Sequence, residues 1–371
     1  MLRIYGKVVE CGAELAQALG AYADAGRPFD GRRVYGNYGV DVVMRSEFGL
    51  ESGEQLRPLP DDTFRRMAQD NVRPKAARLL AILLLPKWLR RALGVAHPTR
   101  DTTIDFFFRM IRRAIRDVDG GSRDDYIVAL VTANRSPIDT SPDTRRGDDS
   151  EQSPKTRDLY LTDDELMSNA YVFLSGAYDT TGTPLSYATY ELALNPDIQQ
   201  RLYDEVMGAP VGDDGHTIPY DTLMEMPFLE AVVSETFRRH GFNYRIDRRA
   251  DRDYTLGDTG ITVKKGQRVQ VPIHAMHHMA EYYKDPYVFD PDRFMPDQRH
   301  LLQRNAYMPF GAGPRVCIAY RFVIMVIKVA LTMVIRQYKF VRSPDTDVPL
   351  RIVSNPVLYL ADRVVVGVER R

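Results

Sequence analysis

The sequence predicts a mainly α-helical fold with a minor β-sheet region. Apolar residues recur at helical spacing over much of the first 135 residues, and one long helix is predicted from Thr162 to Leu194. The stretch from Arg245 to Ile273 changes to the short period and turn residues of strands, and strand-like pieces close the chain. With 371 residues the chain is long enough for one large domain or two ordinary ones, each with a sizeable core.

The first 135 residues contain three predicted helices. Their apolar positions are spaced for one buried face, and the second carries many arginines on its other face; they are Val8 to Ala23, Thr103 to Val118 and Asp124 to Ala133. Residues 136–158 differ, because they are rich in Ser, Pro, Thr, Asp and Arg and nearly free of large apolar side chains. This composition predicts a mobile surface linker.

The long helix has clear start and stop signals. Thr162-x-x-Glu165 is a capping box, and Asn195-Pro196 ends the helix, so the element would span roughly 45–50 Å. Within it, Gly176 lies one turn before Thr180, and a mid-helix glycine costs about 1 kcal/mol. Because a proline follows at 184, we expect the helix to open locally toward a cavity. A kinked core helix is the alternative.

The rest of the chain alternates between helices and short strands. The predicted helices are 197–206, 227–239 and 319–337, and the predicted strands are 254–256, 261–263 and 269–271. The neighbouring histidines His277 and His278 have no cysteine or carboxylate at zinc spacing, so we expect a structural role for them.

Composition excludes several classes of protein. The 50 basic and 50 acidic residues balance, which argues against a nucleic-acid-binding protein. Two cysteines, Cys11 and Cys317, cannot form a disulfide framework and indicate a reducing compartment. The apolar run at 79–85 is too short to span a bilayer. With Trp88 and arginines beside it, it suits a membrane interface or, equally, a buried core position.

The segment from Phe310 to Cys317 carries the most chemical information. A lone cysteine is by itself usually a small buried hydrophobic residue. Here it ends a loop in which Gly311 and Gly313 allow positive φ and close approach to a planar ligand. A helix follows, and its positive end would lower the pKa of the thiol. Arg315 would be free to pair with a carboxylate.

The pattern Phe-Gly-x-Gly-x-Arg-x-Cys resembles the haem-binding loop of the cytochrome P450 family. The family's usual glycine two positions after the cysteine is Ala319 here. The resemblance implies the family's fold, haem b as cofactor, and Cys317 as the axial thiolate ligand of its iron. It also implies that Arg315 and Arg248 bind the haem propionates, although Arg248 in isolation would be taken for a solvated charge.

Glu235 and Arg238 stand three residues apart on one predicted helix face. In isolation such a pair is usually a surface ion pair worth less than about 1 kcal/mol. The resemblance implies instead a buried network completed by Arg293, which would fix the cysteine loop. In the long helix, it implies that Asp179 and Thr180 form an acid–alcohol pair above the iron and deliver protons to dioxygen. Gly176 belongs to the same stretch, and the resemblance counts it, like Phe310 of the loop, among the haem-binding residues.

The chain is most similar to the animal microsomal members of the family, which include the family-three drug-metabolising enzymes and thromboxane synthase. This implies a monooxygenase that acts on an apolar substrate with electrons from NADPH through a separate reductase. It also implies a location at the cytosolic face of the endoplasmic reticulum membrane. Two alternatives stay open: a haem-thiolate isomerase of a lipid peroxide, and a non-catalytic fragment.

Compared with the family, the chain starts within the helical region. We therefore expect residues 1–371 to form a single cytochrome P450 domain that lacks the N-terminal anchor and the first part of the sheet. A helix that carries a Trp/Arg pair for one propionate would be missing as well.

Overall fold

The structure, a computed structural model, describes residues 1–51, 55, 66–68, 70, 76–95, 99–120, 125–135, 160–303, 305–353 and 358–371. These residues divide into two units, one of Met1–Tyr38 with Asp179–Arg371 and one of Gly39–Tyr178. Helices α2 (Gly31–Glu47) and α8 (Asp163–Leu194) belong in part to each. The linker predicted at 136–158 lies outside the described residues.

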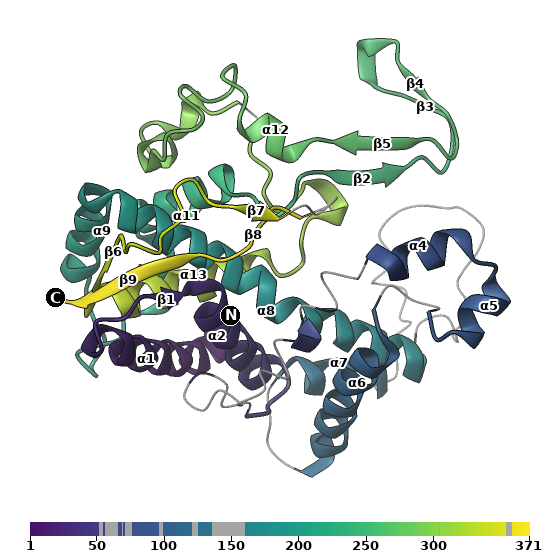
Figure 1. The fold of residues 1–371 in the computed structure, drawn as a ribbon, viewed down its shortest axis with the longest axis horizontal. Helices are drawn as coiled ribbons and strands as arrows, with labels where there is room; N and C mark the ends of the chain where they lie inside the picture. Colours follow the sequence, from purple (N-terminus) through teal and green to yellow (C-terminus); the bar gives the residue numbers. More distant parts are fainter. Residues whose placement is uncertain are drawn as a thin grey trace, which may run out of the picture. The chain divides into compact units, whose positions relative to one another are not determined.

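The first unit is mostly helical (Figure 1), and it holds the predicted site residues other than Gly176. Its further helices are α1 (Leu2–Asp24), α9 (Pro196–Gly208), α10 (Tyr220–Glu225), α11 (Pro227–Arg239), α12 (Ile273–His277) and α13 (Tyr320–Ile335). Short 3-10 turns lie at η4 (Gly257–Thr259), η5 (Pro291–Phe294), η6 (Arg299–Leu301) and η7 (Gly313–Arg315).

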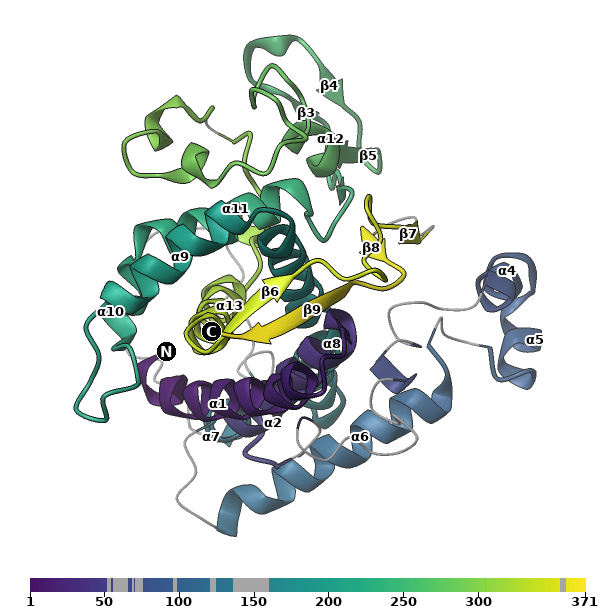
Figure 2. The same ribbon diagram turned by 60° about the vertical axis from the view of Figure 1, so that its left-hand side comes forward.

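Helix α13 is the centre of this unit. It contacts α1 on one side and α9, α10 and α11 on the other, as Figure 2 shows. Most of its side chains are buried, which explains why its sequence is apolar on nearly every face. Helix α1 covers it with a stripe of buried residues at helical spacing, Val8, Cys11, Leu15 and Leu19.

The β component consists of small antiparallel sheets. Strands β1 (Phe29–Asp30), β9 (Val365–Arg370) and β6 (Tyr338–Val341) form a three-stranded sheet in that order. Two-stranded pairs are formed by β2 (Ile246–Arg249) with β5 (Arg268–Val271), β3 (Tyr254–Thr255) with β4 (Thr262–Val263), and β7 (Ile352–Val353) with β8 (Leu360–Ala361). The mainly helical fold class predicted from the sequence is confirmed.

The second unit is helical in its described residues. It contains α4 (Ala76–Leu84), α5 (Lys87–Ala92), α6 (Asp101–Arg116), η1 (Asp117–Gly120) and α7 (Tyr126–Arg135). Helix α6 buries a stripe at four-residue steps, Thr103, Phe107 and Ile111, and keeps most of its arginines outside.

Helix α8 begins with the predicted capping box. The N–H of Glu165 donates to Thr162 Oγ1 at 3.3 Å, and Glu165 Oε2 accepts from the N–H of Thr162 at 2.8 Å. The helix then continues without a break through Gly176 and Pro184 to Leu194. The expected local opening is therefore absent from its backbone. Buried neighbours on several sides of the helix outweigh a propensity cost of about 1 kcal/mol.

Candidate functional site

The cysteine loop is held by its own backbone. The N–H of Cys317 donates to the carbonyl of Phe310 at 3.0 Å, which closes the loop from end to end. Phe310 anchors it by packing on Phe237 of α11, with ring centroids 4.8 Å apart. Cys317 is half-buried, and α13 begins three residues after it at Tyr320 rather than immediately. The thiol lies just before the N-terminal end of a 16-residue helix.

The two glycines of the loop have the backbone conformation that the sequence predicts. Their φ angles are 78° at Gly311 and 74° at Gly313, a region that side chains rarely adopt. A Cβ built at Gly313 would have no atom within 4 Å, so this side of the loop is open. At Gly311 the nearest atom would be Cδ1 of Ile246, at 3.9 Å. This contact places the start of β2 beside the loop.

Arg248 is two residues from Ile246 on β2 and therefore shares its strand face. Strand β2 was not among the strands predicted from the sequence. Arg248 is exposed, and its Nη1 donates only to the carbonyl of Asp247, at 2.9 Å. Arg315 is exposed on the loop. Neither guanidinium forms an ion pair within the described part of the chain, so both are available to a carboxylate ligand.

The three residues of the expected charge network lie together. Arg238 grips Glu235 with two hydrogen bonds, Nε to Oε2 at 2.6 Å and Nη2 to Oε1 at 2.8 Å, and both side chains are fully buried. Arg293 Nε lies 3.6 Å from Glu235 Oε1, and the N–H of Asp290 donates to the same oxygen at 2.9 Å. Burial raises the pKa of Glu235, and the arginines act in the opposite direction.

His277 links this network to the cysteine loop, which the sequence did not reveal. Its carbonyl accepts from Arg238 Nη1 at 2.7 Å, and its Nε2 accepts the N–H of Met308 at 3.2 Å. Tyr307 stacks on the imidazole ring, with centroids 5.6 Å apart. Burial and the charge of Arg238 lower the pKa of His277 to about 3, so the ring is neutral at pH 7 and can accept that hydrogen bond.

Asp179 and Thr180 are neighbours on α8 with different surroundings. Thr180 is half-buried, whereas the carboxylate of Asp179 is 2% exposed and faces α2. Asp179 Oδ1 accepts from Arg32 Nη2 at 2.5 Å, a partner that no sequence pattern indicated. The acid of the expected pair is therefore engaged in a buried ion pair.

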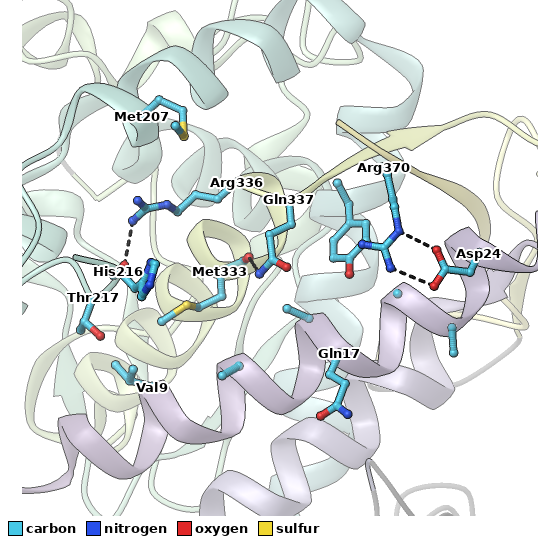
Figure 3. A pocket seen from close by; sticks show the side chains of 15 residues that line it. Val9, Gln17, Asp24, Met207, His216, Thr217, Met333, Arg336, Gln337 and Arg370 are labelled. Carbon is cyan, nitrogen blue, oxygen red and sulfur yellow. Dashed lines mark hydrogen bonds and ion pairs between the residues drawn. The ribbon is translucent and has the colours of Figure 1, made fainter. Parts of the chain in front are cut away.

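A cavity of about 910 Å³ lies elsewhere in the first unit (Figure 3). Helices α1 and α13, strand β9 and the loop at His216 and Thr217 line it. The Asp24–Arg370 ion pair closes one end, and Arg336 donates to the carbonyl of His216. None of the predicted site residues lines this cavity, so it is separate from the cysteine loop.

Comparison with known proteins identifies the family of this chain. Residues 2–363 match the family model for Cytochrome P450. The chain belongs to the cytochrome P450 family. It is 30% identical to probable cytochrome P450 6a13 of Drosophila melanogaster over 96% of this chain and 68% of that protein. It is 29% identical to cytochrome P450 3A2 of Rattus norvegicus, over 95% and 67% of the two chains. The alignment with cytochrome P450 3A25 of Mus musculus covers 100% and 69%, at 28% identity.

A cytochrome P450 is a haem-thiolate oxidoreductase, and the residues of this site suit a haem. They provide a half-buried thiol at a helix N-terminus, an open glycine loop beside it, and two arginines without acidic partners in the described chain. No helix among the described residues is long and apolar enough to cross a membrane.

Proposed function

We propose that this chain is a haem-thiolate monooxygenase, which inserts one oxygen atom of dioxygen into an apolar organic substrate. Electrons would come from NADPH through a separate reductase. The observation that carries the proposal is the loop from Phe310 to Cys317, in which the thiol stands beside two glycines at positive φ. A structural cysteine would need neither the open space at Gly313 nor the unpaired arginine at 315.

The chain's own residues would each perform a binding step. Cys317 would ligate the iron as a thiolate, Arg315 and Arg248 would pair with the two propionates, and Gly311 would let the backbone approach the ring. Haem b, when bound, supplies the iron at which dioxygen is activated. The buried network around Glu235 would keep the loop in place through His277 and the N–H of Met308.

The residues that would transfer protons lie on α8. Thr180 is half-buried, and its Oγ1 can both donate and accept a hydrogen bond. Asp179 next to it would supply the acid of the relay, and Gly176 lies one turn earlier on the same helix. Asp179 is buried against α2, where it pairs with Arg32. Its contribution to the relay would therefore depend on this ion pair.

Helices α4 and α5 support an association with a membrane surface. Leu83, Leu84 and Trp88 are 78%, 76% and 70% exposed, and Arg90 and Arg91 follow within one turn. Exposed apolar residues beside arginines suit the boundary between headgroups and acyl chains. We propose that this surface lies on the cytosolic face of the endoplasmic reticulum. The test is to measure how much protein sediments with anionic phospholipid vesicles. We expect most of the bound protein to be lost from the vesicles when Trp88 and Leu84 are both changed to Ser. An unchanged amount of sedimented protein would refute the proposed contact.

One observation favours a second candidate, a haem-thiolate isomerase of a lipid peroxide. Such a reaction needs no delivered proton, and the carboxylate of Asp179 is tied to Arg32. The two candidates differ in their need for NADPH. Isomerisation of a lipid peroxide without NADPH or reductase, with both peroxide oxygens kept in the product, would favour the isomerase. Oxygen insertion that requires NADPH and the reductase would favour the monooxygenase.

A carbon-monoxide difference spectrum of the reduced, haem-loaded chain tests the proposal. We expect a strongly red-shifted, thiolate-type Soret band, which Cys317→Ala abolishes. Cys11→Ala is the matched control, because it removes the other cysteine, which is buried in α1, and should keep the band. A band of the histidine or protonated-thiol type in the unchanged chain, or loss of the thiolate band in Cys11→Ala alone, would contradict the assignment.

A further inference from the structure

The cavity of about 910 Å³ in the first unit is a long groove along α1 (Figure 3). The residues of α1 that line it share one face of the helix, and most are small: Val9, Ala13, Ala16, Gln17, Gly20, Ala21 and Asp24. From Val9 to Asp24 the helix rises about 22 Å. Because alanine and glycine fill so little space, room remains between α1 and the end of α13.

The walls of the groove between its two ends are mostly apolar. Met207 of α9 and Met333 of α13 line it together with the small residues of α1, and the amides of Gln17 and Gln337 are the polar groups between them. Methionine side chains are unbranched and adapt to flexible apolar ligands. The volume lies within the range of about 300–1,000 Å³ that is usual for sites of organic ligands.

The two ends of the groove differ in charge. At one end Arg370 is satisfied by Asp24, since its Nε donates to Oδ1 at 2.5 Å and its Nη2 donates to Oδ2 at 2.8 Å. At the other end Arg336 is half-buried, and its Nη1 donates to the carbonyl of His216 at 2.8 Å. Arg336 Nε and Nη2 have no partner among the residues that the structure describes. The free positive charge of the groove is therefore at the Arg336 end.

The acceptors near Arg336 are already in use. Asp214 belongs to the same loop as His216, but its Oδ1 accepts the N–H groups of His216 and Thr217 at 2.9 and 2.8 Å, and it does not line the groove. The last carbonyls of α13 also lie at this end, and the N–H groups of Arg336 and Gln337 donate to two of them. Two donors of the guanidinium thus remain for a ligand.

We propose that this groove binds a long-chain fatty acid, with its carboxylate on Arg336 and its alkyl chain along α1 toward the Asp24–Arg370 pair. The 22 Å rise is close to the length of such an acid when extended. A small anion would leave the groove unfilled, and an uncharged chain would cover the donors of Arg336 without replacing their water. The site is separate from the cysteine loop, and the inference does not rest on the proposed monooxygenase function.

The first test is a fluorescence titration of the full chain with cis-parinaric acid, a long-chain carboxylate that fluoresces when it is bound. We expect saturable binding that Arg336→Gln weakens by about tenfold or more, because the carboxylate loses its ion pair. Arg342→Gln removes the same charge from an exposed residue outside the groove and should leave the affinity nearly unchanged. Equal affinities in the two variants, or no saturable binding, would overturn the proposal.

A second pair of variants tests the apolar part of the groove. Ala13 is exposed to the groove, so Ala13→Trp should fill it without disturbing the core and should abolish most of the binding. Ala280→Trp places the same ring at an exposed position elsewhere and is the control. Circular dichroism should show the same melting profile for both. Unchanged binding in a folded Ala13→Trp variant would show that the acid binds elsewhere and would overturn the site.

Competition against cis-parinaric acid identifies the ligand class. Oleate should displace the probe, whereas oleyl alcohol, which lacks the charge, and acetate, which lacks the chain, should each displace it at least about tenfold less well. Equal displacement by oleyl alcohol would overturn the role of Arg336.

The haem-loaded chain separates this site from a substrate cavity. Saturation of the groove should leave the Soret band where it is, whereas an acid beside the iron would shift it. A Soret shift that follows the fluorescence and persists in Arg336→Gln would overturn the proposal. Absence of a thiolate band in the carbon-monoxide spectrum would overturn the proposed function and leave this result untouched.

Discussion

Two buried arginine–carboxylate groups of the first unit, Arg238 with Glu235 and Arg32 with Asp179, differ in how completely their carboxylates are satisfied. Glu235 uses both oxygens: Arg238 donates to each, and Asp290 adds a backbone N–H. Asp179 uses one oxygen, and the other has no partner among the described residues. A fully satisfied carboxylate has no capacity left for a ligand and serves structure. A carboxylate with one unpartnered oxygen, such as that of Asp179, still has an acceptor to offer. Of the two groups, the one on α8 is therefore the better candidate for a chemical role.

The largest effect should follow from breaking the satisfied group. Glu235→Ala leaves Arg238 fully buried without a counter-charge, so we expect a loss of about 3–5 kcal/mol in the free energy of unfolding. Urea denaturation followed by circular dichroism measures it. Glu225→Ala, at an exposed position at the end of α10, is the control and should change stability by less than about 0.5 kcal/mol. Similar losses in both variants would refute the structural role of the network.

A smaller effect should follow at the half-satisfied group. Asp179→Asn keeps an acceptor for Arg32 but removes the negative charge, and we expect a loss of about 1–3 kcal/mol. Asp292→Asn makes the same change in the exposed pair with Arg201 and should cost less than about 1 kcal/mol. If Asp179→Asn were as costly as Glu235→Ala, the contrast between the two groups would be wrong.

The smallest effect is a loss of stability when the pH is lowered. His277 has a folded pKa of about 3 and an ordinary unfolded value near 6.5, so the unfolded state binds the extra proton first. Stability is therefore intact above pH 6.5 and falls as the pH drops toward 3. Between pH 7 and 5.5 the loss should be about 1 kcal/mol. His277→Gln should flatten this dependence in urea titrations, and the exposed His300→Gln should not. An unchanged slope in His277→Gln would show that His277 is not the responsible group.

Local signals predicted much of the fold. Thr162 and Glu165 marked the start of α8 to within a residue, and the Asn195-Pro196 pair marked its end, because caps and prolines act over three or four residues. The strands β3, β4 and β5 also lie where alternation placed them. Strand β1 was missed, since it has only two residues and pairs with β9 more than 300 positions away.

The same limit applies to the candidate site. The loop from Phe310 to Cys317 could be found because its residues are contiguous and its conformation is imposed by glycines. Arg32 and His277 could not, because their roles depend on which helices cross and on which backbone groups lie opposite. An arginine in an ordinary helical sequence carries no sign of a partner 147 positions later.

The backbone contact between Gly36 of α2 and Gly182 of α8 has a practical consequence for anyone who surveys variants of this chain. Neither residue has a side chain, and neither can bind, donate or accept through one. Yet a single added methyl group at 182 would meet backbone within 3 Å, force the helices apart and separate Arg32 from Asp179. A survey of substitutions would therefore find position 182 as sensitive as a residue that takes part in a reaction. The sensitivity at 182 would reflect the close spacing of the two helices and not a chemical role.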